Sequence, residues 1–269
     1  MVTINSNYAA GFAANAAKQT QSDLNSAMEK LSTGKRINFA KDDAAGVAIA
    51  MRLDAEVSGL AVASRNASDG QALIDTADGA LKETHAMLIR MRELAVQAQN
   101  GTLQTSDKTA LGLEFDALEA EITRISANTT WAGTKILDGT YGSTGISFRV
   151  GTSEDITHKI ADMAATAIGL LAAHSVAQAS TISALDLSIA KVSEERAKLG
   201  AVSNRLDSTV TNLDQIRVNL TASKGRIEDA DFAQETGNLA KSQILQQAAT
   251  AMVAQANASK STVLTLLRG

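Results

Sequence analysis

A seven-residue repeat of apolar side chains across residues 53–98 limits the possible folds more than any other feature. One series falls on every seventh position, at Leu53, Leu60, Ala67, Ile74, Leu81, Leu88 and Ala95. A second series follows three positions later, at Ala63, Gly70, Ala77, Met91 and Ala98. This spacing is typical of a coiled-coil helix. A helix from about Ala44 to Gln99 would be roughly 80 Å long, so the pattern predicts a rod.

The composition favours helices and excludes several classes of protein. Aromatic residues make up 3% of the 269 residues and proline is absent, so the 45% apolar content comes mainly from Ala, Leu, Ile and Val. The absence of cysteine excludes disulfides and thiolate metal sites. A net charge of -4 supplies no basic surface for nucleic acid, and no apolar run reaches membrane-spanning length. We therefore expect no nucleic-acid partner and no membrane insertion.

Further heptad stripes predict helices before and after the long one. A first helix from Ala10 should end near Gly34, where glycine can adopt the left-handed conformation that closes a helix. Asp42 and Asp43 are well placed to cap the long helix that follows. After the break at 100–102, a third helix returns antiparallel with apolar residues at Leu111, Phe115, Leu118, Ile122 and Ile125.

Two more helices are expected in the second half of the chain. A fourth long helix spans about Thr181 to Thr221, and polar residues such as Arg196 interrupt its seam and would fix its register. The last helix begins after Gly225.

The segment between the third and fourth helices has a different pattern. Lys135–Gly139 and Ile146–Gly151 are predicted as two strands of one hairpin, while 156–180 is ambiguous between a partial helix and a loop. The fold class is therefore mainly α, a long antiparallel coiled-coil bundle with a small β-hairpin near 134–151. The expected domains are 1–44 plus 225–269 as terminal helices, and 45–224 as a rod with a short tip at 152–180.

The two ends of the chain each carry a stripe of small apolar residues. Paired only with each other, they would bury too little surface to offset a backbone ordering entropy of roughly 1–2 kcal/mol per residue. Assembly of many copies would cover both stripes. The residues expected to pack there are Ala10, Ala17, Leu24, Leu31, Leu245, Ala249, Met252, Ala256, Val263 and Leu266.

No catalytic, cofactor or metal site is expected. His85, His158 and His174 are scattered without a partner at helical spacing, and the capping role explains Asp42 and Asp43 without any catalysis. Gly70 and Gly79 follow aspartates as in a phosphate loop, but no Lys-Ser/Thr follows and the heptads continue through them. Helix packing is the favoured interpretation.

Both ends of the chain resemble bacterial flagellin. The similar blocks are Leu31–Asn38, Ala40–Gly46, Arg65–Gly70, Arg92–Gln97, Arg196–Ala201, Arg226–Ala233, Gln243–Ala248 and Val263–Arg268. The chain departs from the family at Trp131-Ala132-Gly133, where Phe-Asn-Gly is usual, and in lacking proline near the last turn.

The resemblance implies a structural subunit that polymerises with itself into the extracellular filament of the bacterial flagellum and serves swimming motility. It implies export by the flagellar export apparatus with an export chaperone and without a cleaved signal peptide, and contact with hook-associated and cap proteins. The interval 152–180 is too short for the large outer domains common in the family, so a short form is expected.

The resemblance also implies a candidate surface for a Toll-like innate immune receptor. The chain matches this surface at Arg90, Leu94 and Glu114, but Ile89 stands where the recognised flagellins have Gln. Two other classes stay open at this point: a hook-associated junction protein, which shares similar ends, and a signalling coiled coil such as a chemoreceptor hairpin. An enzyme is disfavoured.

Overall fold

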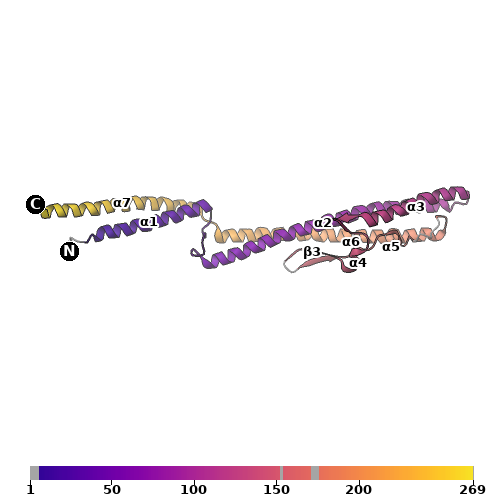
Figure 1. Ribbon diagram of the computed structural model, residues 1–269, viewed down its shortest axis with the longest axis horizontal. Helices are drawn as coiled ribbons and strands as arrows, with labels where there is room; N and C mark the ends of the chain where they lie inside the picture. The colour runs from indigo at the N-terminus through magenta and orange to yellow at the C-terminus, as the bar shows by residue number, and fades with distance from the viewer. Residues whose placement is uncertain (1–5, 152–153, 171–175, 269) are drawn as a thin grey trace. The chain divides into compact units, whose positions relative to one another are not determined.

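The computed structural model describes residues 6–151, 154–170 and 176–268 (Figure 1). The chain forms two compact units, which we call the terminal unit (Met1–Glu56 with Asn219–Gly269) and the central unit (Val57–Val218). Two long helices, α2 (Ala44–Ala98) and α6 (Ala179–Glu228), contribute residues to both.

The terminal unit is built on two antiparallel helices, α1 (Tyr8–Thr33) and α7 (Phe232–Arg268), which lie side by side (Figure 1). The Asn7 side chain caps α1 by accepting the Ala10 N–H at 3.1 Å. Gly34 ends the helix with φ 71°, the left-handed conformation predicted for it.

The junction between α6 and α7 differs from the prediction. The fourth helix was expected to end at about Thr221 and the last helix to begin after Gly225, but Gly225 lies inside α6, which continues to Glu228. The break comes at Asp229–Asp231, where the Asp231 carboxylate accepts the N–H of Ala233 at 2.9 Å and so caps α7. A glycine tolerated inside a long helix and a stronger cap six residues later account for the shift.

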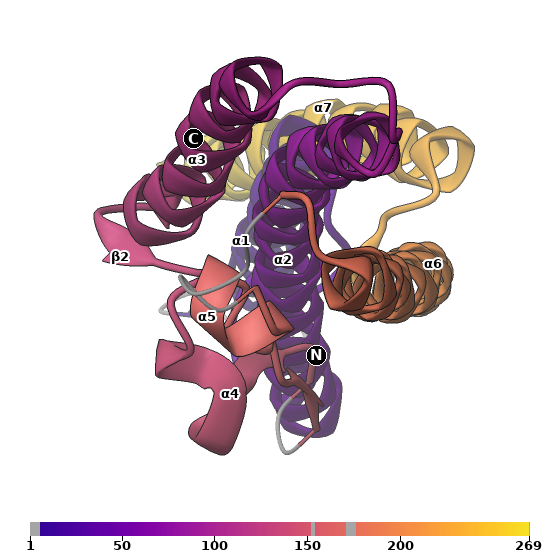
Figure 2. The ribbon, with the colours of Figure 1, turned by 90° about the vertical axis from the view of Figure 1, so that its right-hand side faces the viewer.

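The central unit packs three helices around an apolar core. In the end view, α2 lies between α3 (Thr105–Asn128) and α6, with the short α4 and α5 segments below (Figure 2). The core takes buried side chains from every one of these long helices, among them Leu81, Leu88, Phe115, Ile122, Leu185, Val192 and Leu199. The predicted heptad positions therefore face inward, and the mainly α fold of long helices is confirmed.

The segment between α3 and α6 holds two small antiparallel sheets and two short helices. β1 (Thr130–Trp131) pairs with β2 (Thr134–Lys135), and β3 (Ile146–Arg149) pairs with β4 (Asp155–His158). The short helices are α4 (Thr140–Thr144) and α5 (Ala165–Ile168).

The predicted hairpin is therefore wrong in its pairing. Lys135–Gly139 does not pair with Ile146–Gly151, because the Leu137 carbonyl accepts instead from Met163 N–H (3.0 Å) and the Ser126 hydroxyl (2.8 Å). Asp138 then accepts the Thr140 N–H at 3.1 Å, which turns the chain into α4.

Candidate assembly surface of the terminal helices

The seam between α1 and α7 is made of small side chains. Ala13, Leu24 and Ala27 of α1 are buried, as are Ser242 and Ala249 of α7. Ser242 and Ala249 are seven residues apart, about two helical turns, so both lie on the same face of α7. Alanine permits close helix approach but buries little area, so the seam contributes only modestly to stability.

The predicted packing residues differ in how far they are buried. Leu24 and Ala249 are buried, and Ala10, Ala17, Leu31 and Ala256 are half-buried. Leu245 and Met252 are exposed, since the face of α7 that meets α1 is centred on Ser242 and Ala249. Val263 and Leu266 lie outside the residues whose side chains the structure describes.

A second apolar face remains uncovered on each helix. On α1, Tyr8 and Phe12 are one turn apart and are 75% and 80% exposed. On α7, Ile244 is 65% exposed, Met252 is 62% exposed and Leu245 is 44% exposed. We call these five side chains the outward apolar face. Large apolar side chains gathered in this way mark an interaction surface.

Polar contacts across the seam set its register. The Lys30 ammonium and Glu235 carboxylate are 3.4 Å apart, Gln246 donates to the Gln21 side chain, and Asn7 Nδ2 donates to the Ala256 carbonyl at 3.4 Å. An alanine-rich seam alone would permit slippage by a heptad, whereas polar residues on a seam specify one alignment.

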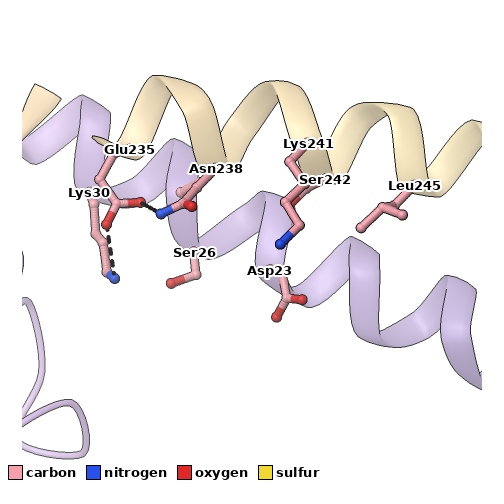
Figure 3. A pocket seen from close by; sticks show the side chains of 9 residues that line it. Asp23, Ser26, Lys30, Glu235, Asn238, Lys241, Ser242 and Leu245 are labelled. Atoms are coloured by element: carbon pink, nitrogen blue, oxygen red, sulfur yellow. Dashed lines mark hydrogen bonds and ion pairs between the residues drawn. The ribbon is translucent and has the colours of Figure 1, made fainter. Parts of the chain in front are cut away.

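An open notch of about 320 Å³ interrupts the seam near Lys30 and Glu235 (Figure 3). Asn238 Nδ2 donates to Glu235 at 3.2 Å, while Asp23 and Lys241 also line the notch. Its lining is mostly polar and comes from the two antiparallel helices α1 and α7, which lie side by side (Figure 3). The notch therefore resembles a solvent-exposed gap between two helices and not a small-molecule binding site.

The connector between α1 and α2 is bound to the α6–α7 junction, which no local pattern in the sequence indicates. Arg36 N–H donates to the Glu228 carbonyl (2.6 Å), and its guanidinium donates to the Ile227 carbonyl (2.8 Å). Ala230 N–H donates to the Gly34 carbonyl at 2.9 Å. These bonds hold the start of α7 beside the end of α1.

The two aspartates of the connector have different roles. Asp43 caps α2 through the Gly46 N–H at 2.9 Å, as predicted. Asp42 instead accepts the N–H groups of Phe39 (3.0 Å) and Asn38 (3.2 Å) within the connector. The hydrogen bond from Phe39 is the main reason that the pKa of Asp42 lies below its ordinary value.

The candidate receptor residues of the central unit are only partly at the surface. Arg90 on α2 and Glu114 on α3 are exposed and form an ion pair of 2.8 Å. The pKa of Arg90 is raised above its usual value, mainly by the hydrogen bond to Glu114 and then by that to Glu93. Leu94 is only 1% exposed and packs in the core, so its assignment to a binding surface is wrong.

Comparison with known proteins covers almost the whole chain. The model of the bacterial flagellin N-terminal helical region matches residues 4–142, and that of the C-terminal helical region matches residues 182–267. The flagellin of Bacillus subtilis (strain 168) is 41% identical, with 98% of this chain and 99% of that protein aligned. The chain belongs to the bacterial flagellin family. The flagellin of Halalkalibacterium halodurans is 44% identical over 90% of this chain and 91% of its own length.

Membership of this family decides between the classes that the sequence left open. This flagellin is a structural subunit of the flagellar filament and not an enzyme. A putative flagellar hook-associated protein from Vibrio parahaemolyticus has a TM-score of 0.60 at 15% identity, over 70% of this chain and 100% of that chain. That likeness concerns the fold alone.

Within the described part of this flagellin, no group of three His, Cys, Asp or Glu side chains is arranged to hold a metal ion. Searched over the same residues, none of the helices combines the length and the apolar character needed to cross a membrane.

Proposed function

We propose that the α1–α7 pair forms the inner core of the filament, and that the outward apolar face is covered there by the same pair of neighbouring subunits. The observation that carries this proposal is the exposure of Tyr8, Phe12, Ile244, Leu245 and Met252. Fully burying a side chain of this size contributes about 1.5–3 kcal/mol. Polymerisation would therefore supply free energy that the isolated helix pair lacks.

The domain division follows from the same argument. Residues 1–44 and 225–269 would form the filament core, and 45–224 would lie outside it with the tip at 152–180. Contacts between non-equivalent surfaces of successive subunits do not close on themselves, and they generate an open helical polymer.

A pair of substitutions on α7 tests the proposal. Ile244→Ser with Met252→Ser should leave the helical content of the monomer unchanged, because both side chains are exposed there. The concentration needed for polymerisation should rise on the order of tenfold for each 1.4 kcal/mol of lost burial. Gln243→Ser is the matched control, since Gln243 is also exposed and lies on the opposite side of the same helix from Met252.

Sedimentation and electron microscopy of the purified chains provide the readout. Filaments from the double variant at the wild-type concentration would overturn the proposal. Deletion of residues 1–35 is the stronger version of the test and should abolish polymerisation while the central helices persist.

The outward apolar face is also the reason for proposing partners that bind the chain during export and at the filament ends. Before assembly it would be shielded by an export chaperone as the chain passes the flagellar export apparatus, and in the filament it would meet hook-associated and cap proteins at the ends. Export without a cleaved signal peptide stays a prediction, which the intact mass of protein recovered from filaments would test.

Recognition by a Toll-like receptor is proposed only through Arg90 and Glu114. Ile89 is exposed beside them and lacks the amide that Gln would supply for hydrogen bonding. Ile89→Gln should therefore raise the response of a receptor reporter cell, whereas Val96→Gln, also at an exposed apolar position of α2, should not. No response to either monomer would remove the receptor from the list of partners.

A further inference from the structure

The turn between α2 and α3 contains Asn100 followed by Gly101, and both residues are exposed. Asn100 lies beyond the last residue of α2, Ala98, and its N–H donates to the Gln97 carbonyl at 3.0 Å in a turn that follows the helix. Its Oδ1 accepts the Thr102 N–H at 3.2 Å. Among the described residues, no acceptor is recorded for the Gly101 N–H.

We propose that Asn100 is a site of spontaneous deamidation. The Gly101 amide nitrogen loses its proton to solvent base and attacks Cγ of Asn100, forming an N–Cγ bond. The Cγ–Nδ2 bond breaks and the side-chain nitrogen leaves as ammonia, which gives a five-membered succinimide. Water then opens either imide carbonyl, yielding aspartate or isoaspartate at position 100 with no change in oxidation state.

Three features of the turn favour this reaction. Gly101 has no Cβ to hinder the approach of its nitrogen, and a Cβ built there would meet no described atom within 4 Å. Its N–H is not committed to an acceptor in the described structure. The Thr102 N–H points at Oδ1, where negative charge develops during the attack, and a fixed donor at that place stabilises the charge.

Asn25–Ser26 in α1 is the internal comparison. Asn25 is also exposed, but it lies in the middle of a helix and its Oδ1 accepts from Gln21 Nε2 at 3.0 Å. Helical backbone angles hold the next nitrogen away from Cγ. The same chemistry should therefore be slow at Asn25.

Deamidation would place a negative charge at the carboxyl end of α2. The helix dipole disfavours an anion there. Gln99 Nε2 donates to the Gln178 carbonyl at 3.2 Å, so the altered turn adjoins the contact between the end of α2 and the segment before α6. Isoaspartate would also add one methylene to the backbone, and the Asn100 main-chain carbonyl, which accepts the Leu103 N–H at 3.3 Å, would become a free carboxylate outside the peptide link.

Mass spectrometry of aged, folded full-length protein tests the proposal. Trypsin releases residues 93–108 with Asn100 and residues 19–30 with Asn25, so one digest reports both sites. The acid form of 93–108 should accumulate faster than that of 19–30, more so in mildly alkaline buffer, with isoaspartate detectable by electron-transfer fragmentation. Samples digested at time zero correct for deamidation during handling.

Two variants separate the chemistry from the fold. Gly101→Ala should slow the reaction on the order of tenfold, because its Cβ hinders attack. Asn100→Gln should stay amidated, since its longer side chain would have to form a six-membered ring. Equal accumulation in the two wild-type peptides, or an unchanged rate in Gly101→Ala, would overturn the proposal.

Discussion

Arg196 of α6 and Asp78 of α2 are joined by two hydrogen bonds, Nε to Oδ1 at 2.7 Å and Nη2 to Oδ2 at 3.2 Å. The pair lies beside the apolar core, and the hydrogen bond to Asp78 is the main reason that the pKa of Arg196 is raised. A planar guanidinium matches a carboxylate in this way, whereas a lysine ammonium cannot make both bonds. Arg196 therefore fixes the alignment of α2 and α6, the role predicted for a polar residue on the seam.

Replacing Arg196 by Lys should lower the free energy of unfolding by about 0.5–1 kcal/mol, because the charge remains but the paired geometry is lost. Denaturant unfolding followed by circular dichroism measures this. Arg124→Lys is the control, since among the described residues Arg124 pairs with Glu121 of its own helix and not with a second element. Equal losses in both variants would show that the interhelical bond has no special role.

Two glycines of α2 should respond oppositely to substitution by alanine. A Cβ on Gly70 would lie 2.7 Å from the Phe148 ring of β3, whereas one on Gly79 would meet no described atom within 4 Å. Gly70→Ala should cost about 1–3 kcal/mol through overpacking. Gly79→Ala should stabilise the protein by roughly 1 kcal/mol through helix propensity. Thermal unfolding midpoints distinguish the two, and stabilisation by Gly70→Ala would mean that β3 is not docked on α2.

The β1–β2 turn contains strained backbone that a substitution should relieve. Ala132 has φ 49° and Gly133 has φ 83°, the two positive values of a type I′ turn. Ala132→Asn should stabilise the protein by about 0.5–1 kcal/mol, because asparagine adopts this conformation more readily than alanine. Ala120→Asn, at an exposed position within α3, should instead destabilise slightly. A loss of stability in Ala132→Asn would contradict the assigned turn.

Acid should weaken the packing of β4 through His158. Its Nε2 is buried and has no hydrogen-bond partner among the described residues. Burial lowers the pKa of His158 below 6.5, Glu195 partly opposes this effect, and Lys198 adds to it.

The sign of the pH effect follows from this depressed pKa. The unfolded chain binds the proton more readily, so the contribution of His158 to stability is complete above pH 6.5 and is lost as the pH falls through the folded-state pKa. Unfolding midpoints measured from neutral to mildly acidic pH should therefore fall less in His158→Gln than in the wild type. His85→Gln, which leaves His158 in place, should follow the wild-type curve, and parallel curves for all three proteins would refute the assignment.

Much of the helical architecture could be read from local patterns. The heptads predicted α2 as Ala44 to about Gln99 and it ends at Ala98, and Gly34 ends α1 as expected. Gly70 was assigned to helix packing, and it does lie within α2, but a Cβ added there would meet Phe148 of the strand β3 and not a second helix. These predictions succeeded because helix formation, capping and the seven-residue period depend on neighbours within a few residues.

Other features needed the folded chain. Leu94 matches a receptor motif in sequence, yet it is buried within the core cluster that α2 forms with residues from other elements. Leu245 and Met252 share a heptad with Ala249 and Ala256, but only the smaller residues face α1. The strand at Ile146–Arg149 pairs with Asp155–His158, because the Leu137 carbonyl is already occupied by Met163 and Ser126.

The amino-acid sequence by itself determined the family, the helical class and the approximate bounds of the long helices. Periodicity and capping depend on residues that are close together in the sequence, so they can be recognised without the fold. Only the tertiary structure decided which apolar stripe is covered within the subunit and which stays exposed for neighbours. That choice depends on the competition between partners brought together from distant parts of the chain, such as Arg36 with Glu228 and Arg196 with Asp78. Such partners have no signature in the spacing of residues along either helix.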